Sequence, residues 1–149
     1  MSTLVVYYTA PGEDREVAEA VARESGAETE FIREVHTAEG LFGFNKNVLW
    51  GGPAEEDIGE PTHDPSTYDL VAIGSSVENG HITAPVEAFV KAYRDDLPRV
   101  AFFLMGDEAE SRPALRELSE LSGKQPVATA CLQAQDRAAI SQFAEAIRQ

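Results

Sequence analysis

Four short runs of unbroken apolar residues constrain the fold of this chain more than any other feature. They cover residues 4–8, 70–73, 100–105 and 127–132, and a fifth, more alternating and charged run covers residues 29–33. Unbroken apolar runs of this length are typical of strands that are buried on both faces of a parallel sheet. The fifth run is interpreted as an edge strand because its charged positions require solvent.

Segments with helical periodicity separate these runs. Gly26 and Gly123 stand where helices are expected to stop, and Pro113 where one is expected to start. The alternation of strands and helices predicts a single doubly wound α/β domain over residues 1–149, with right-handed crossovers. The apolar stripes recur at spacings of three and four residues. They are Val17, Val21 and Ala22; Val86, Phe89, Val90 and Tyr93; Leu115, Leu118 and Leu121; and Ile140, Phe143, Ala144 and Ile147.

Residues 35–66 do not follow this alternation. They are rich in glycine and proline and lie where a helix and its loops are expected. A structureless loop of this length is unusual in a compact domain, so the segment is interpreted as either a functional loop or a stretch that contains a short helix.

The composition narrows the class of protein. The 149 residues carry a formal net charge of −14, which predicts repulsion from nucleic acids and anionic membranes, while 43% hydrophobic residues argue for a folded globule. A single cysteine, Cys131, excludes an internal disulfide, and His36, His63 and His81 show no metal-ligand spacing. Without a signal-like start or a membrane-length apolar run, we expect a cytoplasmic location.

The architecture predicts where a ligand binds. In open α/β sheets the site lies beyond the carboxyl ends of the strands, so three loops, residues 9–14, 75–83 and 106–112, are expected to form it. The candidate cofactor-binding residues are Thr9, Ala10, Pro11, Gly12, Glu13 and Asp14 in the first loop, Ser75, Ser76, Val77, Glu78, Asn79, Gly80 and His81 in the second, and Gly106 and Asp107 in the third.

Two of these segments resemble the flavodoxin family. Thr9-x-Pro11-Gly12-x-Asp14 lies where flavodoxins carry a hydroxyl-rich phosphate loop, and residues 69–85 resemble the strand and loop that border the flavin ring. The resemblance implies a flavodoxin-like five-stranded parallel sheet of order 2-1-3-4-5 with helices on both faces. It also implies bound flavin mononucleotide (FMN) and low-potential electron transfer. A segment similar to residues 79–81 occurs in flavodoxin-type oxidases such as quinone-dependent protoporphyrinogen oxidases, so a small oxidoreductase is an alternative.

The first loop departs from the family pattern in ways that weaken phosphate binding. Pro11 has no N–H to donate, and Asp14 with Glu13 places carboxylates where a phosphate would bind a helix N-terminus. At about 5 Å and an effective dielectric near 20, each pair of unit charges costs roughly 3 kcal/mol. Arg15 would offset part of this repulsion if it points into the loop. In the alternative interpretation, Asp14 only caps the helix, which is worth about 1 kcal/mol.

The second loop has its own departures. Glu78 stands where the family often has an aromatic residue that stacks on the flavin, and Asn79-Gly80 is a strong turn signal. The resemblance makes Gly80 the candidate for a peptide that reorients when the flavin is reduced. His81 is interpreted either as a hydrogen-bond donor to the ring or as an exposed loop histidine, and Thr83 as a helix cap.

Aromatic residues outside these loops are open to two interpretations. Phe42, Phe44 and Trp50 are either stacking partners for a flavin or satellite core, and they would form an interface if exposed. The residues interpreted as core are Phe31, Phe102, Phe103 and Cys131, with the thiol inert.

Acidic residues gather in all three loops, and Glu55, Glu56 and Asp57 extend the run. Three interpretations of these acids are open: they dock a basic redox partner, they bind a cation such as Mg²⁺, or they mark a site that has lost its nucleotide. Two functions of different classes follow. The first is an FMN-dependent electron carrier or small oxidoreductase with weakened FMN affinity, and the second is a regulatory or protein-binding module that does not bind FMN. The acids of the loops are Glu13, Asp14, Glu78, Asp107, Glu108 and Glu110.

Overall fold

The computed structural model describes residues 2–9, 12–32 and 63–148. Several predicted features lie outside these residues. They are Ala10 and Pro11 of the first loop, and Phe42, Phe44, Trp50 and residues 55–57 of the middle segment. The described end of that segment contains a short 3₁₀ helix, η1 (Pro65–Thr67).

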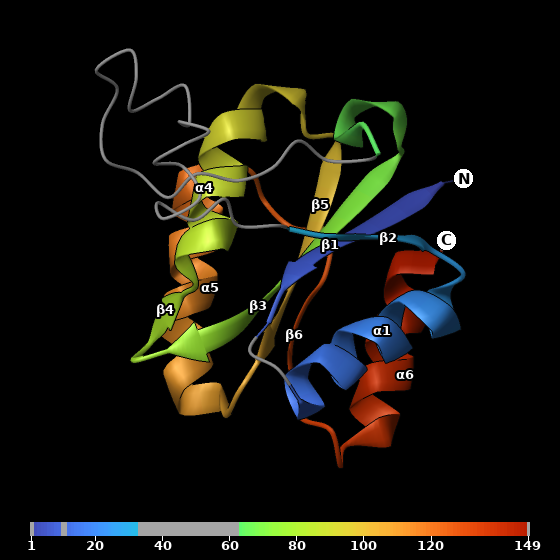
Figure 1. Cartoon of the computed structure of the whole chain (residues 1–149), viewed down its shortest axis with the longest axis vertical. Coiled ribbons are helices and arrows are strands. Elements are labelled where there is room, and N and C mark those ends of the chain that lie inside the picture. The colour runs from blue at the N-terminus through green and yellow to red at the C-terminus, as the bar shows by residue number, and fades with distance from the viewer. Residues whose placement is uncertain (1, 10–11, 33–62, 149) are drawn as a thin grey trace, which may run out of the picture.

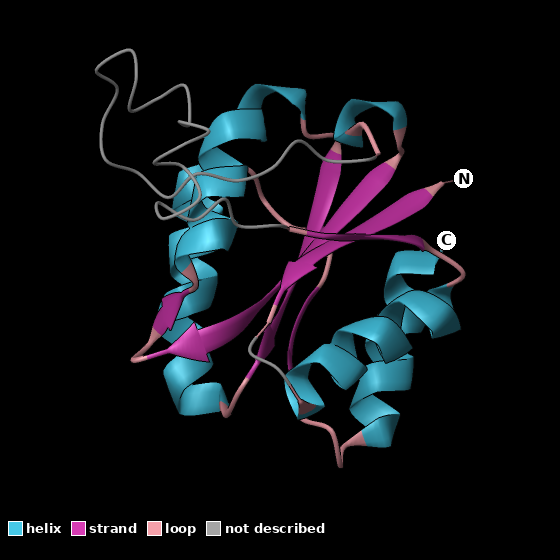
Figure 2. Ribbon diagram, viewed as in Figure 1, coloured by secondary structure: helices cyan, strands magenta, loops and turns pink. Residues whose placement is uncertain are grey.

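Five parallel strands form the central sheet in the order β2-β1-β3-β5-β6, which is the predicted 2-1-3-4-5 order of the parallel strands (Figure 2). The run interpreted as an edge strand is confirmed as one edge, and the last strand is the other. The strands are β1 (Thr3–Tyr8), β2 (Glu28–Phe31), β3 (Leu70–Glu78), β5 (Arg99–Met105) and β6 (Thr129–Leu132). A two-residue strand, β4 (His81–Ile82), pairs antiparallel with β3 and was not predicted.

Helices cover both faces of the sheet. Helices α1 (Glu13–Ser25) and α6 (Arg137–Arg148) lie side by side on one face. Helices α4 (Ala84–Tyr93), continued by the 3₁₀ turn η2 (Arg94–Asp96), and α5 (Glu108–Ser122) lie on the other (Figure 1). None of the described helices has the length and apolarity that a membrane span requires.

The two helix layers explain the unbroken apolar runs. Along β1, Val5 and Tyr7 point into the core beneath α1 and α6, whereas Leu4 and Val6 point into the core beneath α4 and α5. All four side chains are at most 3% exposed. A strand with a core on each side has no solvent face, so alternate polar positions are absent.

The helix ends follow the sequence signals with one exception. Gly26 and Gly123 end α1 and α5 in the left-handed conformation, as predicted. The prediction that a helix starts at Pro113 was wrong, because α5 begins at Glu108 and Pro113 lies inside it. The start is fixed by Asp107, whose Oδ1 accepts a hydrogen bond from the Glu110 N–H at 2.9 Å. Pro113 has no N–H to donate within the helix, but α5 continues beyond it to Ser122.

Candidate functional site

The second predicted loop is a β-hairpin rather than a loop. β3 continues through Ser75, Ser76 and Val77 to Glu78, and β4 pairs back with Val77 opposite Ile82 and Glu78 opposite His81. Asn79 and Gly80 form the turn with φ values of 52° and 81°. A two-residue turn with both φ values positive matches the twist of a hairpin, and Asn-Gly is its favoured sequence. The sequence therefore predicted the turn correctly, but it did not predict that β4 pairs with β3.

Buried hydroxyl groups occupy the base of this hairpin. Ser75 and Thr83 are at most 2% exposed, and the Ser75 Oγ accepts a hydrogen bond from the Thr83 N–H at 3.0 Å. The two hydroxyl oxygens are 3.2 Å apart. Thr83 occupies the N-cap position of α4 as predicted, but its side chain makes no capping hydrogen bond. The hydroxyl stabilises the hairpin base instead, because Ser75 lies beside it.

Asp14 joins the first predicted loop to the hairpin. Its Oδ2 accepts a hydrogen bond from the Ser76 hydroxyl at 2.7 Å, and Ser76 is only 3% exposed. The interpretation of Asp14 as the N-cap of its helix was wrong, because Gly12 holds that position and Asp14 lies in the first turn. The half-buried carboxylate is thus held between the start of α1 and the end of β3.

The N-terminus of α1 lacks a side-chain cap. Gly12 occupies the cap with φ 106° and ψ −135°, a conformation that glycine alone adopts easily, and it has no side chain to bond the first-turn amides. The first amides of a helix have no partner within it and bind anions well. Just before this loop, the Oγ1 of Thr9, a residue only 5% exposed, has no hydrogen-bond partner among the described residues.

These features fit an oxygen-rich ligand group at this end of the sheet. A buried hydroxyl without a partner is costly, and its desolvation is recovered only when a polar atom reaches it. The uncapped amides of α1, a few residues further along the chain, offer further donors. The backbone and Thr9 therefore fit the phosphate end of FMN, whereas the Asp14 carboxylate does not.

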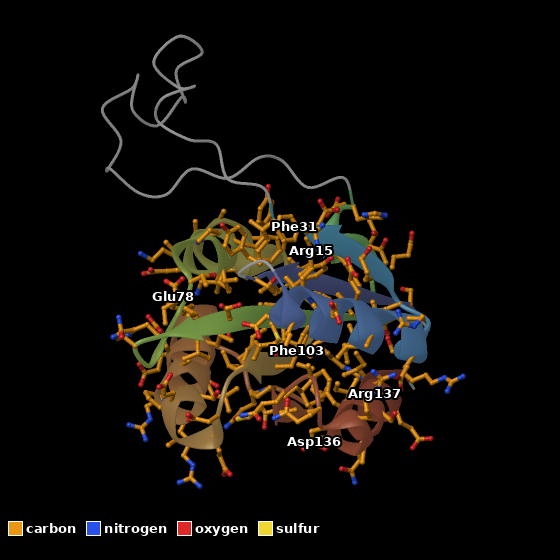
Figure 3. All side chains as sticks on the ribbon, turned by 60° about the horizontal axis from the view of Figure 1, so that its bottom comes forward. Arg15, Phe31, Glu78, Phe103, Asp136 and Arg137 are labelled. Carbon is orange, nitrogen blue, oxygen red and sulfur yellow. The ribbon has the colours of Figure 1, made fainter. Side chains whose placement is uncertain are left out.

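Arg15 does not point into the loop. Its guanidinium carbon lies 4.6 Å from the centroid of the Phe31 ring, and its Nε lies 3.4 Å from Glu19 Oε2. Figure 3 shows Arg15 beside Phe31, on the β2 side of the molecule. Phe31 also stacks on Tyr8, with ring centroids 5.4 Å apart. The expected compensation of the loop's negative charge by Arg15 is therefore absent in this arrangement.

The third predicted loop packs against the hairpin. A Cβ added at Gly106 would lie 3.4 Å from Val77 Cβ, and one added at Gly80 would lie 3.5 Å from Pro113 Cγ of α5. The loop and the turn therefore lie close to Val77 and Pro113, at distances that an added Cβ would meet as ordinary van der Waals contacts. Two of the acids here have structural partners, since Asp107 caps α5 and Glu108 lies 2.9 Å from the Arg112 guanidinium.

His81 and Glu78 lie at the outer end of the hairpin. His81 is 70% exposed, and its Nδ1 lies 3.6 Å from Glu117 Oε1 of α5. The same Glu117 oxygen accepts a hydrogen bond from the Ile82 N–H at 3.2 Å. His81 is thus an exposed histidine, and its contact with Glu117 helps to hold the hairpin against α5. Glu78 is exposed and lies to the left of Phe31 in Figure 3.

A cluster that the sequence did not reveal lies beside β2. His63 Nδ1 is 2.8 Å from Glu30 Oε1, its Nε2 is 3.4 Å from Glu28 Oε2, and the Tyr68 hydroxyl donates to Glu28 Oε1 at 2.8 Å. Burial, followed by the hydrogen bond and the charge of Glu28, raises the pKa of Tyr68 from 10.0 to about 12. No periodic signal links residues so far apart, so sequence reasoning had no means of finding the cluster.

Cys131 of β6 lies near the third predicted loop, since Glu108, Arg112 and Asp107 of that loop act on its thiol. It lines a hollow of about 380 Å³ between β6 and α6, together with Ala130 and Phe143. The interpretation of Phe102 and Phe103 as core is confirmed at 0% exposure, whereas Cys131 and Phe31 are only partly buried. Burial raises the pKa of the Cys131 thiol, which agrees with an inert role. Within the described ranges, no three His, Cys, Asp or Glu side chains are placed to hold a metal ion.

Comparisons with known proteins agree with this architecture. The profile of the flavodoxin domain family matches residues 54–137. A flavoprotein from Lactobacillus acidophilus, solved in complex with FMN, has 19% identity and a TM-score of 0.70, with 92% of this chain and 96% of that chain covered. A putative flavoprotein from Bacteroides eggerthii has 20% identity and a TM-score of 0.73, covering 99% and 98%.

A WrbA-like flavodoxin from Agrobacterium tumefaciens has 15% identity and a TM-score of 0.63, covering 99% of this chain and 96% of that chain. At these identities the solved structures establish the shared fold. Comparison with curated proteins gave no match.

Proposed function

We propose that this chain, which belongs to the flavodoxin family, is a flavin-dependent redox protein that acts as an electron carrier or small oxidoreductase. The observation that carries the proposal is the buried Thr9 hydroxyl, which has no partner among the described residues and lies just before the uncapped start of α1. A flavin, when bound, supplies one-electron or hydride transfer, and the protein supplies binding and orientation.

Different residues would bind different parts of FMN. The amides of Gly12 and Glu13 at the start of α1 and the Thr9 hydroxyl would hold the phosphate end of FMN by hydrogen bonds and the helix dipole. The hairpin turn at Asn79 and Gly80 would border the ring. Gly80 has a positive φ of 81°, so its peptide tolerates a change of orientation that a side chain would oppose.

The acidic surface favours a basic redox partner. With a net charge of −14, the protein attracts a positively charged protein over a distance set by ionic strength. Electron transfer from the reduced, flavin-loaded protein to a basic haem protein should therefore slow as salt is added. A rate that does not change with salt would count against this partner class.

One substitution separates a binding role of Thr9 from a structural one. Thr9→Val keeps the shape and removes the hydroxyl, so it should weaken FMN binding roughly tenfold or more. The stability of the ligand-free protein should stay the same or rise, because an unpartnered buried hydroxyl is removed. Thr129→Val on the exposed end of β6 is the matched control and should leave FMN affinity unchanged.

The test of the proposal itself is direct. The visible spectrum of the purified protein is recorded with and without added FMN, and thermal unfolding is followed in parallel. Co-purifying flavin or saturable binding with a raised melting temperature supports the proposal, because a ligand of the native state must stabilise it. A colourless protein whose melting temperature ignores millimolar flavin would refute it.

That negative result would favour the second candidate, a regulatory or protein-binding module without flavin. The hydrogen bond between Asp14 and Ser76 is the observation in its favour, because it holds a carboxylate of the protein itself in the first turn of α1. Such a module would bind its partner equally well with and without flavin in solution.

A further inference from the structure

We propose that Asp14 makes this a site for a flavin without a phosphate group, so that riboflavin binds more tightly than FMN at low ionic strength. The inference rests on the proposed function and names the cofactor class that this site takes. Asp14 is then a specificity-determining residue, because its carboxylate accepts a hydrogen bond from a terminal hydroxyl and repels a phosphate.

The position of the Asp14 carboxylate is fixed. The Ser76 hydroxyl, at 3% exposure, donates to its Oδ2 at 2.7 Å, and Ser76 belongs to the central strand β3. Among the described residues, no hydrogen bond reaches the other oxygen, Oδ1. The carboxylate therefore keeps one acceptor for a ligand hydroxyl, and turning it away would break the 2.7 Å hydrogen bond to Ser76.

The charges around Asp14 do not compensate it. Glu13 and Glu16 lie in the same first turn of α1, so this helix start carries three acids. Arg15, the base within that turn, lies over Phe31 and beside Glu19. A unit charge about 5 Å away in an effective dielectric near 20 lowers the affinity for an anion by roughly 100-fold. A phosphate with nearly two negative charges meets this repulsion, and a neutral hydroxyl does not.

A second observation indicates that a polar group is nevertheless expected here. Thr9 Oγ1, in a residue only 5% exposed, has no partner in the described part of the chain, and the amides of α1 have no side-chain cap. A terminal ribityl hydroxyl can form hydrogen bonds of the kind that Thr9, the amides of α1 and Asp14 each require. Its oxygen accepts from an amide or from Thr9, and its hydrogen is donated to Asp14. Dinucleotide-binding folds use the same chemistry when an acidic residue accepts a ribose hydroxyl and excludes a phosphate.

The experiment titrates the full chain, freed of flavin, with riboflavin and with FMN at low salt, following flavin fluorescence and the melting temperature. The key variant is Asp14→Asn, whose amide oxygen still accepts from Ser76 while the charge is lost. Glu145→Gln, on the exposed face of α6, removes one charge far from the site as the matched control.

We expect riboflavin to bind the native protein at least tenfold more tightly than FMN. Asp14→Asn should raise FMN affinity at least tenfold and change riboflavin affinity less than threefold, whereas Glu145→Gln should change neither by more than twofold. Added KCl should raise the FMN affinity of the native protein and have less effect in Asp14→Asn, because salt screens the repulsion.

The outcomes separate this inference from the proposed function. Tighter binding of FMN than of riboflavin, with no gain in Asp14→Asn, overturns the specificity and leaves a flavin-binding protein. Failure of both flavins to bind the native protein and the variant overturns the specificity and the proposed function together.

Discussion

The contact between Gly74 and Phe103 gives a prediction about the strand that carries the site. A Cβ added at Gly74 of β3 would overlap the Phe103 ring, with Cε1 at 2.7 Å and two further ring atoms closer still. Ordinary contacts between carbon atoms are about 3.5–4.0 Å, so the ring or the strand would have to move by about an ångström. Phe103 has no free space, since it is 0% exposed and its ring centroid lies 5.4 Å from that of Phe143.

We therefore expect Gly74→Ala to lower the free energy of unfolding by about 1–3 kcal/mol, the usual cost of overpacking. For a domain of this size each kcal/mol lowers the melting temperature by roughly 2–4 °C. Gly106→Ala is the matched control, because its added Cβ would meet Ser111 Oγ and Val77 Cβ at 3.4 Å without overlap.

Phe103→Leu provides the rescue, because leucine lacks the ring atoms that the new methyl group would meet. Denaturant unfolding of the two single variants and the double variant should give a coupling energy of about 0.5–3 kcal/mol in favour of the double variant. A Gly74→Ala protein as stable as the native one, or strictly additive effects, would refute the reasoning.

Further predictions concern the surroundings of the site. Because burial and Glu28 raise the pKa of Tyr68 from 10.0 to about 12, stability should be lost as pH rises through this window, and Tyr68→Phe should remove that part of the loss in urea titrations. The Cys131 thiol has a raised pKa, so its alkylation at neutral pH should be slower than that of a cysteine peptide; faster reaction would contradict the assignment. Glu117→Ala removes the acceptor of the Ile82 N–H and should speed hydrogen exchange there severalfold, whereas an unchanged rate would mean that the hairpin is held otherwise. The net charge of −14 predicts a melting temperature that rises with KCl, and a flat response would exclude self-repulsion as a destabilising factor.

The sheet could be predicted because burial on both faces leaves a simple signature. Leu4, Val5 and Val6 are apolar in succession since each points into one of two cores, and the same holds for residues 70–73 of β3. The glycines that end α1 and α5 could be predicted equally well. A left-handed helix cap favours glycine itself and does not depend on which residues pack around it.

The features that the sequence did not predict depend on contacts between residues that are distant in the sequence. Ser75 and Ser76 resemble a loop because buried hydroxyl residues in a strand need hydrogen-bond partners. The backbone, Thr83 and Asp14 supply those partners here. The pairing of His63 with Glu30 has the same character. Sequence patterns indicate periodicity and turns, but they do not indicate which buried polar groups form hydrogen bonds with one another in the fold.

The most direct test of the account is a map of where flavin binds. Backbone amide shifts of isotope-labelled protein are followed during a titration with riboflavin and then with FMN. The account predicts shifts concentrated at Thr9, Gly12, Asp14, Ser76 and Gly80, at the carboxyl edge of the sheet. Shifts confined to the hollow between β6 and α6, or no shifts with either flavin, would contradict it.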